Sequence, residues 1–562
     1  VDGVAITSTG GPLNLDFQAG YAFDAAANST TGGSVFLQSG TTLGSNGGSV
    51  LLQANAPSPN TGVHLNGAVI NAGAGAVSVV ANAILDSAIK LENSQISAGS
   101  VLFSGNVSAG GDYGVYLANS SLTTSGAINL GSTASRVKLV GSTLISGGGS
   151  ITLSAKGVAD AGHTSSLALV SSSPPAPVST TIQTTGAGTI TLTGELTGGG
   201  VSAPSVSAGV LVDGATVTTG GGALTVNGKS GVAPSPGVTG PTLGVRVAAS
   251  GSLGAGSGAL SITGETGNSS GPDSVGVALD GTATANSITV VGTASNPSQS
   301  SLTGISVKGT LSAANNLSLN GTISGQSGKG VDVAAGATVN SGAGGLAIQG
   351  SATSGSTSAA VEGISISGAV TSSGPITATG VVSVPVGNTA AIHGLSLMAA
   401  GQITATGTGG IALSGSGVPS PAPATQFDLN LAGTTISSAG GEIKLVGDRV
   451  NLATSLNSGS GRTMIVPFTT SRLISLGGID EIGTLNLSNG ELSQVSASVI
   501  VVGGGTYTGG LSVDGAVNIN PARSQALSLI SAGVISQTGA LAVNKLNADG
   551  GGGVSLMHAS NS

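Results

Sequence analysis

Nine short blocks that open with Gly and continue with alternating apolar residues recur along this chain of 562 residues. They are GVHL at 62–65, GVYL at 114–117, GVLV at 209–212, GVRV at 244–247, GVAL at 276–279, GISV at 304–307, GVDV at 330–333, GISI at 363–366 and GLSL at 394–397. A second alternating block follows most of them, as in GALTV at 222–226, and a shorter apolar pair lies between, as in ATVTT at 215–219. Such a repeat indicates a stacked array, in which each unit buries its apolar side against the next unit.

One unit therefore predicts three short strands. Period-two alternation with β-branched residues favours strands, and Gly or Asn at the corners permits positive φ. In the unit that begins at Gly209, we expect the inward side chains to be those of Val210, Val212, Val217, Leu224 and Val226. The predicted fold is all-β, a parallel β-helix with three strands in each coil and one elongated solenoid.

The composition agrees with a thin aliphatic stack. Gly accounts for 99 of the 562 residues and charged residues for only 6%, whereas mean hydropathy is positive at +0.40. Few charges with high hydropathy exclude an ordinary disordered chain. With four Tyr, six Phe and no Trp, the chain also lacks the large side chains that usually fill a thick globular core.

Charge and cysteine content exclude several function classes. The net charge is −8 and the 14 basic residues are scattered singly, so nucleic acid is not an expected partner. No apolar run approaches the roughly 20 residues that span a bilayer, so we expect no transmembrane segment. The absence of Cys rules out a disulfide framework and thiol chemistry, and it suits export through an oxidising periplasm.

Extra residues between units enter mainly at one phase, after the third strand and before the next opening block. The segments assigned to this phase are 55–61, 171–179, 228–243, 264–275, 292–303, 350–360 and 414–426. Pro and Ser are frequent in them, which predicts solvated surface loops. Loops at one corner are the candidate surface for contact with another molecule, and the alternative is tolerated variation without a ligand.

The rhythm changes from about Glu442. We therefore divide the chain into a β-helical shaft over 1–441, with variable Pro/Ser/Gly loops at one corner, and a continuing β-helix with an altered repeat over 442–562. In the second part, NGELSQVSA predicts one helical turn, because Ser488 and Asn489 offer caps before Glu491.

The opening stretch VDGVAITSTGGPLNLDFQA and the later phrases GTLNLS, GELSQVSA, VIVVGG and LSLISAGVISQTGALAVNKL resemble the large exoproteins of the filamentous haemagglutinin type. Gram-negative bacteria export these proteins by two-partner secretion. The resemblance in style covers nearly the whole chain, and the distinctive wording covers roughly the last hundred residues.

This resemblance implies a right-handed β-helical shaft that is secreted or held at the bacterial cell surface and serves adhesion and biofilm formation. It implies an outer-membrane transporter of the Omp85 type as the export partner, and a host or bacterial glycan or protein of unknown identity as the contact partner. The family's secretion motif, NPNG or NPNL, is missing, because Asn296-Pro297 and Asn520-Pro521 are followed by Ser and Ala. Either a secretion domain lies upstream or export follows another route, and we expect a segment of a longer chain.

An enzyme is not expected. A carbohydrate-active β-helix needs acids grouped on one face. The only adjacent acidic pair in the sequence is Asp480-Glu481, with Arg472 as its candidate neighbour, and we interpret this pair as a solvated corner. No aromatic residue occurs between Tyr116 and Phe427 to stack on a sugar. We therefore assign no catalytic residue.

No metal or cofactor site is expected either. The four histidines, His64, His163, His393 and His558, are too few and too far apart in sequence for an obvious metal site. We attribute the GxSxG string at 267–271 and the near P-loop at 222–230 to chance in a Gly- and Ser-rich chain. The Asn-x-Ser/Thr triplets leave glycosylation open; they include Asn106, Asn119, Asn268, Asn320 and Asn486.

Three functions remain. The first is a structural shaft of a secreted adhesin that holds a distal binding region away from the cell. The second is a self-assembling subunit of an extracellular filament or matrix fibre, which low charge and exposed solenoid edges would permit. The third, a distant alternative, is a carbohydrate-active β-helix enzyme. Polymerisation of isolated chains would distinguish the filament from the shaft.

Overall fold

The structure is a computed structural model. It describes residues 1–19, 33–56, 60–108, 112–158, 164–173, 177–197, 206–231, 241–267, 273–418, 425–479 and 483–562. Strands make up 59% of the chain and helix 1%. The chain divides into two compact units, Val1–Thr289 and Val290–Ser562, and each unit is described by itself.

Unit 1 repeats three kinds of strand, which we call first, second and third strands in the order of the sequence repeat. The first strands are β3 (Val35–Leu37), β6 (Val63–Asn66), β9 (Ile89–Glu92), β12 (Val115–Ala118), β15 (Val137–Val140), β18 (Ser165–Val170), β21 (Ser207–Asp213), β24 (Thr242–Val247) and β27 (Val275–Leu279). The second strands are β1 (Ala5–Thr7), β4 (Thr42–Gly44), β7 (Val69–Asn71), β10 (Gln95–Ala98), β13 (Ser121–Thr124), β16 (Thr143–Ser146), β19 (Thr180–Thr184), β22 (Ala215–Thr218), β25 (Ser252–Gly254) and β28 (Thr282–Ala285). The third strands are β2 (Leu15–Ala19), β5 (Val50–Asn55), β8 (Ala76–Ala83), β11 (Ser100–Val107), β14 (Ile128–Ser132), β17 (Ile151–Val158), β20 (Ile190–Thr197), β23 (Leu224–Gly231) and β26 (Ala259–Thr266).

Strand β29 (Ser287–Ser295) carries the chain into unit 2, which repeats the same three strands. The first strands are β30 (Leu302–Val307), β33 (Gly328–Val333), β36 (Val361–Ile366), β39 (Ile392–Leu397), β42 (Gln426–Leu431) and β45 (Val450–Leu452). The second strands are β31 (Thr310–Ala313), β34 (Thr338–Ser341), β37 (Ala369–Ser372), β40 (Gln402–Ala405), β43 (Thr435–Ser438) and β46 (Ser455–Asn457). The third strands are β32 (Asn316–Gly325), β35 (Gly345–Ser354), β38 (Ile376–Ser383), β41 (Ile411–Ser416), β44 (Ile443–Val446), β47 (Arg462–Val466), β50 (Val495–Gly504), β53 (Ser524–Ser531) and β56 (Leu546–Gly550).

The last part of unit 2 departs from this pattern. Beyond β45, strands β48 (Leu473–Leu476), β49 (Thr484–Leu487), β51 (Leu511–Val513) and β54 (Ile535–Gln537) form a separate four-stranded sheet, and β52 (Val517–Asn518) pairs with β55 (Leu541–Ala542). This change of architecture lies within the segment where the sequence rhythm changes.

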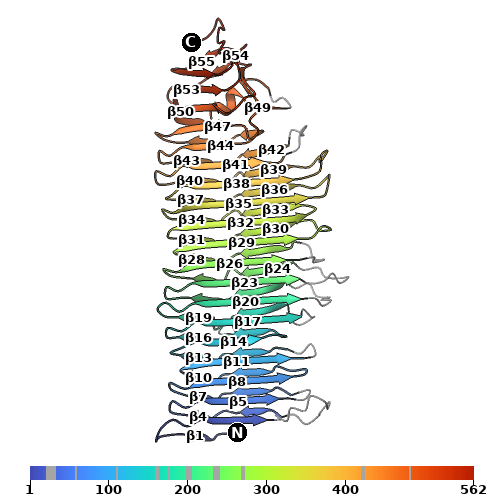
Figure 1. Ribbon diagram of the computed structural model, residues 1–562, viewed down its shortest axis with the longest axis vertical. Helices are drawn as coiled ribbons and strands as arrows, with labels where there is room; N and C mark the ends of the chain where they lie inside the picture. Colours follow the sequence, from blue (N-terminus) through green and yellow to red (C-terminus); the bar gives the residue numbers. More distant parts are fainter. Residues whose placement is uncertain are drawn as a thin grey trace. The chain divides into compact units, whose positions relative to one another are not determined.

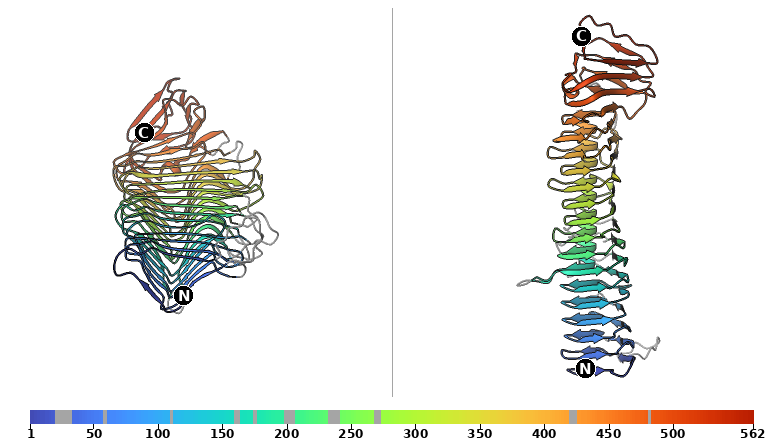
Figure 2. Two further views of the ribbon diagram at one scale, coloured as in Figure 1. Left: turned by 60° about the horizontal axis from the view of Figure 1, so that its bottom comes forward. Right: turned by 90° about the vertical axis from the view of Figure 1, so that its left-hand side faces the viewer.

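Each repeated strand pairs in parallel with its counterpart one coil further on, as β21 does with β24, β22 with β25 and β23 with β26. Figure 1 shows the second strands of unit 2 stacked at the left and its third strands in the middle, and Figure 2 shows the strands of each unit in successive coils. The predicted parallel β-helix of three-strand coils is confirmed. The five side chains predicted to point inward in the coil at 209–226 are all fully buried.

Buried hydroxyl groups line the corner between first and second strands in unit 1. The Ser120 Oγ accepts a hydrogen bond from the Ser94 N–H at 3.1 Å and donates to the Ala118 carbonyl at 2.9 Å. One coil further, the Ser142 Oγ accepts from the Ser120 N–H at 3.2 Å. This ladder satisfies backbone N–H groups that would otherwise be buried without a partner.

The prediction of Gly corners with positive φ is confirmed at Gly67, Gly141 and Gly214, each of which directly follows a first strand. The glycines of the opening blocks have a different role. Gly209 and Gly244 lie inside first strands and do not have positive φ. Instead, a Cβ added to Gly228 of β23 would lie 2.1 Å from the carbonyl oxygen of Gly244, and one added to Gly264 would lie 2.1 Å from that of Gly276. The third strand of one coil thus touches the first strand of the next coil backbone to backbone, which leaves no room for a side chain.

In both units a small second apolar cluster lies beyond these glycine pairs. In unit 1 it lies on first strands and includes Ala208 and Leu243, and in unit 2 first and third strands pack against each other in it. In unit 2 it includes Leu302, Ile323, Val361 and Ile392. We call this region the side layer. The third strands extend past the main core to reach the side layer, so they are longer than the sequence repeat suggested. Strand β23, for example, continues to Gly231.

In chain order, six of the predicted loop segments follow a third strand and precede the next first strand, as expected: 55–61, 228–243, 264–275, 292–303, 350–360 and 414–426. The first residues of the last five are strand rather than loop, because the third strands continue to Gly231, Thr266, Ser295, Ser354 and Ser416. Residues 57–59, 232–240, 268–272 and 419–424 lie outside the described residues. The assignment of 171–179 to this phase was wrong, since this segment lies between β18 and β19, after a first strand. Its coil opens with SSLALV, which lacks the Gly that marked the other opening blocks. Pro interrupts strand pairing at any phase, so Pro alone did not locate the insertion.

The predicted helical turn is confirmed as α1 (Asn489–Leu492), with Ser488 as its N-cap and Glu491 completing a capping box. The Glu491 Oε1 also accepts a hydrogen bond from the Leu452 N–H at 3.0 Å, at the edge of β45 where the first strands end. Among the described residues, no helix is long and apolar enough to cross a membrane.

Candidate functional site

An outward column of aromatic and basic side chains crosses five successive first strands of unit 1. Parallel pairing places Phe36 of β3 beside His64 of β6, then Lys90 of β9, Tyr116 of β12 and Lys138 of β15. Because neighbouring strands lie about 4.8 Å apart, these side chains form one continuous row. We call these five residues, together with Tyr113, the contact strip.

The first half of the contact strip is held by one carboxylate. The Phe36 ring meets the His64 ring edge to face, with centroids 5.2 Å apart. The Glu92 Oε2 lies 2.9 Å from the His64 Nε2 and 3.2 Å from the Lys90 Nζ. Burial acts to raise the pKa of Glu92, but the hydrogen bonds from His64 and Lys90 outweigh it and hold that pKa below its ordinary value.

The second half of the contact strip stacks two aromatic rings under a cation. The Tyr113 and Tyr116 rings are 5.3 Å apart at 28°, and the Lys138 Nζ lies 5.5 Å from the Tyr113 centroid. Burial lowers the pKa of Lys138, although the Asp112 carboxylate acts in the opposite direction. Burial also raises the pKa of Tyr116, with Glu92 adding to the effect. Phe36 remains 42% exposed, so an aromatic edge of the strip is open to a ligand.

A related cluster lies on the first strands of unit 2, and its aromatic rings contact other side chains of the same unit. Lys329, Glu362, His393 and Phe427 occupy the same register position on successive first strands. The His393 and Phe427 rings stack with centroids 6.1 Å apart, and the Arg449 guanidinium lies 5.3 Å from the Phe427 centroid. Burial lowers the pKa of His393, and the Glu362 carboxylate opposes this effect. The stack links β39 to β42, and the Arg449 guanidinium lies over its Phe427 ring, so the cluster joins neighbouring coils to one another.

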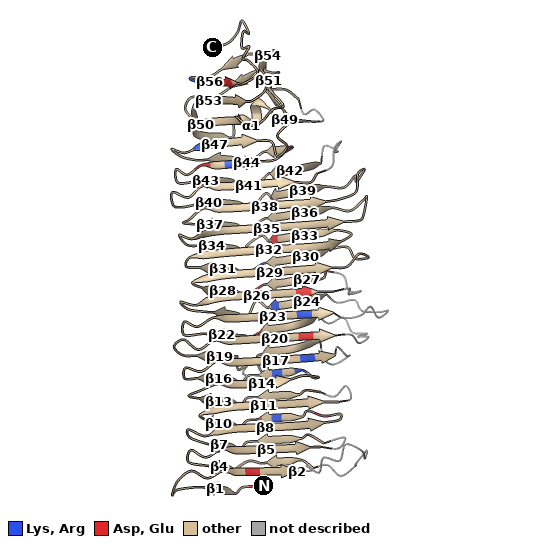
Figure 3. Ribbon diagram, viewed as in Figure 1, with Lys and Arg blue, Asp and Glu red and all other residues tan. Residues whose placement is uncertain are grey.

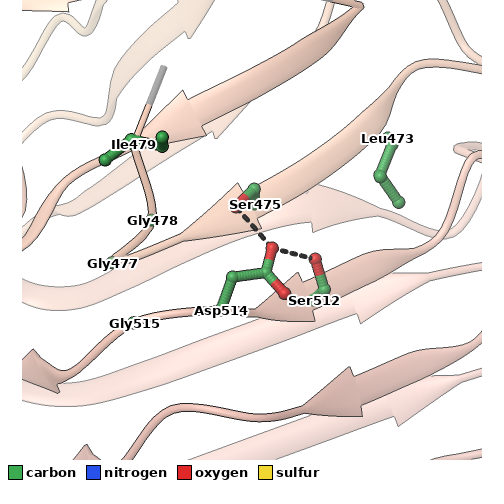
Figure 4. A pocket seen from close by; sticks show the side chains of 8 residues that line it. All are labelled: Leu473, Ser475, Gly477, Gly478, Ile479, Ser512, Asp514 and Gly515. Atoms are coloured by element: carbon green, nitrogen blue, oxygen red, sulfur yellow. Dashed lines mark hydrogen bonds between the residues drawn. The ribbon is translucent and has the colours of Figure 1, made fainter. Parts of the chain in front are cut away.

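A hollow of about 670 Å³ lies in the separate sheet of unit 2. It is lined by Leu473, Ser475, Gly477, Gly478, Ile479, Ser512, Asp514 and Gly515. The Asp514 Oδ2 accepts hydrogen bonds of 2.6 Å from both the Ser475 and Ser512 hydroxyls, as Figure 4 shows. Asp514 is the one acid in this lining, whereas glycosidase chemistry requires a pair of carboxyl groups.

The residues singled out from sequence have the following positions. Asp480, Glu481 and His163 lie outside the described residues, as does most of the GxSxG string at 267–271. The Arg472 Nη2 lies 3.4 Å from the Asp448 Oδ2, and the near P-loop lies in strand β23, as its sequence indicated. The described residues hold no group of three His, Asp or Glu that could bind a metal ion.

The contact strip was not predicted from the sequence, although a signal was present. His64 and Tyr116 occupy the same position in the blocks GVHL and GVYL. Lys90, Lys138 and Phe36 lie in strands that lack the opening Gly, so those strands were not aligned with the other blocks.

The fold places the chain among repeat proteins of the parallel β-solenoid class. A comparison with protein-family models, curated proteins and solved structures found no match to the chain.

Proposed function

We propose that this chain is the structural shaft of a secreted bacterial surface adhesin that supports cell adhesion and biofilm formation. The contact strip is the observation that carries this proposal. Five outward side chains are kept in register by paired strands over an aliphatic core, which is the way a stiff scaffold presents a binding surface. The proposed action is mechanical support and binding, without catalysis.

The proposed partners follow from the resemblance and from the charge of the strip. An outer-membrane two-partner transporter would export the chain to the surface of a Gram-negative cell. The contact partner is a host or bacterial glycan or protein. Within the strip, Glu92 lies beside Lys90 and His64, and Asp112 acts on Lys138. Because acids accompany the bases, the strip suits a ligand recognised by aromatic contacts more than a polyanion.

A bead-adhesion assay tests this proposal. Microspheres coated with the purified chain should adhere to epithelial cells or to biofilm matrix more than bare microspheres do. A variant carrying Phe36→Ala and Tyr116→Ala should lose about tenfold in half-saturating affinity, because exposed aromatic anchors dominate such contacts. Leu102→Ala is the matched control, since Leu102 is 47% exposed on a third strand away from the strip. Adhesion equal to that of bare beads, or unchanged in the double variant, would contradict the proposal.

A further inference from the structure

The outward residues of the second strands form a surface without charge. We leave β1 aside and consider the 15 second strands from β4 to β46, each of which has two outward positions. None of these 30 positions is Asp, Glu, Lys or Arg, and 19 are Ser or Thr. In unit 1 they are Thr42 and Gly44, Val69 and Asn71, Gln95 and Ser97, Ser121 and Thr123, Thr143 and Ile145, Thr181 and Gln183, Thr216 and Thr218, Ser252 and Gly254, and Thr282 and Thr284. In unit 2 they are Thr310 and Ser312, Thr338 and Asn340, Ala369 and Thr371, Gln402 and Thr404, Thr435 and Ser437, and Ser455 and Asn457. We call this surface of each unit its hydroxyl face.

The other two outward surfaces carry the charges. On the third strands of unit 1, Lys156, Glu195, Lys229 and Glu265 follow one another in register. Lys156 lies 3.2 Å from Glu195, and Lys229 lies 3.0 Å from Glu265. Figure 3 shows these alternating charges, whereas the second strands are drawn entirely in tan. Surface charge helps to keep copies of a protein apart, and the outward positions of these second strands carry none.

From this difference we propose that the hydroxyl face is a contact surface for a second copy of this chain. A face that meets its own copy also meets its own charges, so a surface without charge avoids like-charge repulsion. The proposal goes beyond the adhesion function and does not rest on the contact strip.

The geometry of the hydroxyl face suits packing against an identical surface. Parallel in-register strands repeat every 4.8 Å or so, and such ladders of Thr, Ser, Asn and Gln interdigitate when two sheets meet face to face. The Thr282 Oγ1 donates to the Ser252 Oγ at 3.0 Å, along the stack. This bond orders side chains before contact, which reduces the entropy lost on association.

The size of the face predicts a weak contact. Nine strands of unit 1 extend about 40 Å along the stack, and a strand of four residues is about 13 Å long. One unit therefore offers about 500 Å² per copy, so a pair buries about 1,000 Å², at the lower limit for a specific interface. Contact strength should increase with the number of coils that face each other, as expected for bundling of repeat proteins.

Other partners fit the face less well. The face has no aromatic or Arg anchor of the kind that dominates a compact protein interface, so a protein contact must be spread over many coils, which a second copy of the same repeat provides. Without charge it does not attract an ionic ligand. A neutral polysaccharide is the remaining occupant, and the experiment separates it from a second copy.

Sedimentation velocity across a concentration series tests the proposal with a matched pair of variants. One variant carries Thr218→Lys and Thr284→Lys on the hydroxyl face. The control carries Thr225→Lys and Thr263→Lys on the outward side of the third strands β23 and β26. Both change net charge equally, and in each pair one Thr is half-buried and the other exposed. We expect the wild type and the control to associate reversibly, and the hydroxyl-face variant to need at least tenfold higher concentration.

Several results would overturn the proposal. The wild type could stay monomeric at every concentration. The two variants could lose association equally, or the hydroxyl-face variant could associate as fully as the wild type. Circular dichroism of the variants ensures that a loss of association is not a loss of fold. If the wild type is monomeric, its retention on an amylose or cellulose matrix is measured as well. Retention that is lost only in the hydroxyl-face variant would assign the face to a neutral polysaccharide instead.

Discussion

Replacing Gly228 by Ala tests whether the glycine pairs fix the cross-section of each coil. A Cβ at Gly228 would lie 2.1 Å from the Gly244 carbonyl oxygen and 2.6 Å from the Val245 Cγ2. A carbon–oxygen contact needs about 3.3 Å, so the two backbones must separate by about 1.2 Å. Overpacking of this kind costs about 1–3 kcal/mol, and the clashing atom is backbone held by strands on both sides. After the gain from a stiffer unfolded chain, we expect a net loss of about 2 kcal/mol.

Strand β23 supplies its own control. Gly231 lies three residues further along the strand, and nothing lies within 4 Å of the position where its Cβ would be. Its φ is not positive, so Gly231→Ala should be neutral or stabilise by about 0.5 kcal/mol. Native-state hydrogen exchange is the suitable assay, because a repeat array opens locally and a single unfolding transition is not assured.

The expected result is about 30-fold faster exchange of the β23 and β24 amides in Gly228→Ala, since each 1.4 kcal/mol is a factor of ten. Exchange in Gly231→Ala should equal the wild type or be slower. Equal protection in the two variants would show that the first and third strands can separate freely, and the close approach at Gly244 would then have no role in stability.

Three further predictions concern buried groups. Ser120→Ala should cost about 1–3 kcal/mol in thermal unfolding by leaving a buried N–H unpaired, whereas its neighbour Ser121→Ala should change stability by less than about 0.5 kcal/mol. Burial raises the pKa of Asp428 to about 6 from an ordinary 3.8, so the folded state binds the carboxyl proton more tightly than the unfolded state does. The stability of unit 2 should therefore increase as pH falls from about 7 toward 4. Urea midpoints measured across this pH range should show the increase in the wild type and not in Asp428→Asn. Val212→Asp places a charge in the fully buried core and should stall export into the medium, if folding helps to draw the chain outward. Thr225→Asp, at a half-buried position on the outward side of β23, should leave export unchanged.

The strands of the coil at 209–226 could be predicted because two independent patterns agree there. The alternation marks the inward side chains, and β-branched residues favour the extended backbone. The turn at Ser488 was predictable for a similar reason, since the capping interaction needs only residues three apart in sequence. Both features depend on local sequence.

Corner glycines with positive φ were predictable, but the close approach of the opening-block glycines to the third strands was not. A Gly at a corner with positive φ and a Gly at a close approach look alike in sequence, because both positions exclude a side chain. The close approach joins Gly228 to Gly244 across 16 positions of the chain, part of which lies outside the described residues. Recognising it would have required pairing the Gly that follows each third block with the Gly of the next opening block.

The glycine pairs also explain how the outward rows survive loops of varying length. Most insertions enter at the side layer, beyond the point where first and third strands touch. The chain between β22 and β25 includes the segment 232–240, outside the described residues, yet Thr216 still lies opposite Ser252 and Thr218 opposite Gly254. An insertion there lengthens a loop without shifting the register of the main coil. The side layer can therefore change in sequence and length while the contact strip and the hydroxyl face keep their rows, which allows a β-solenoid to vary its loops without losing either of the two proposed contact surfaces.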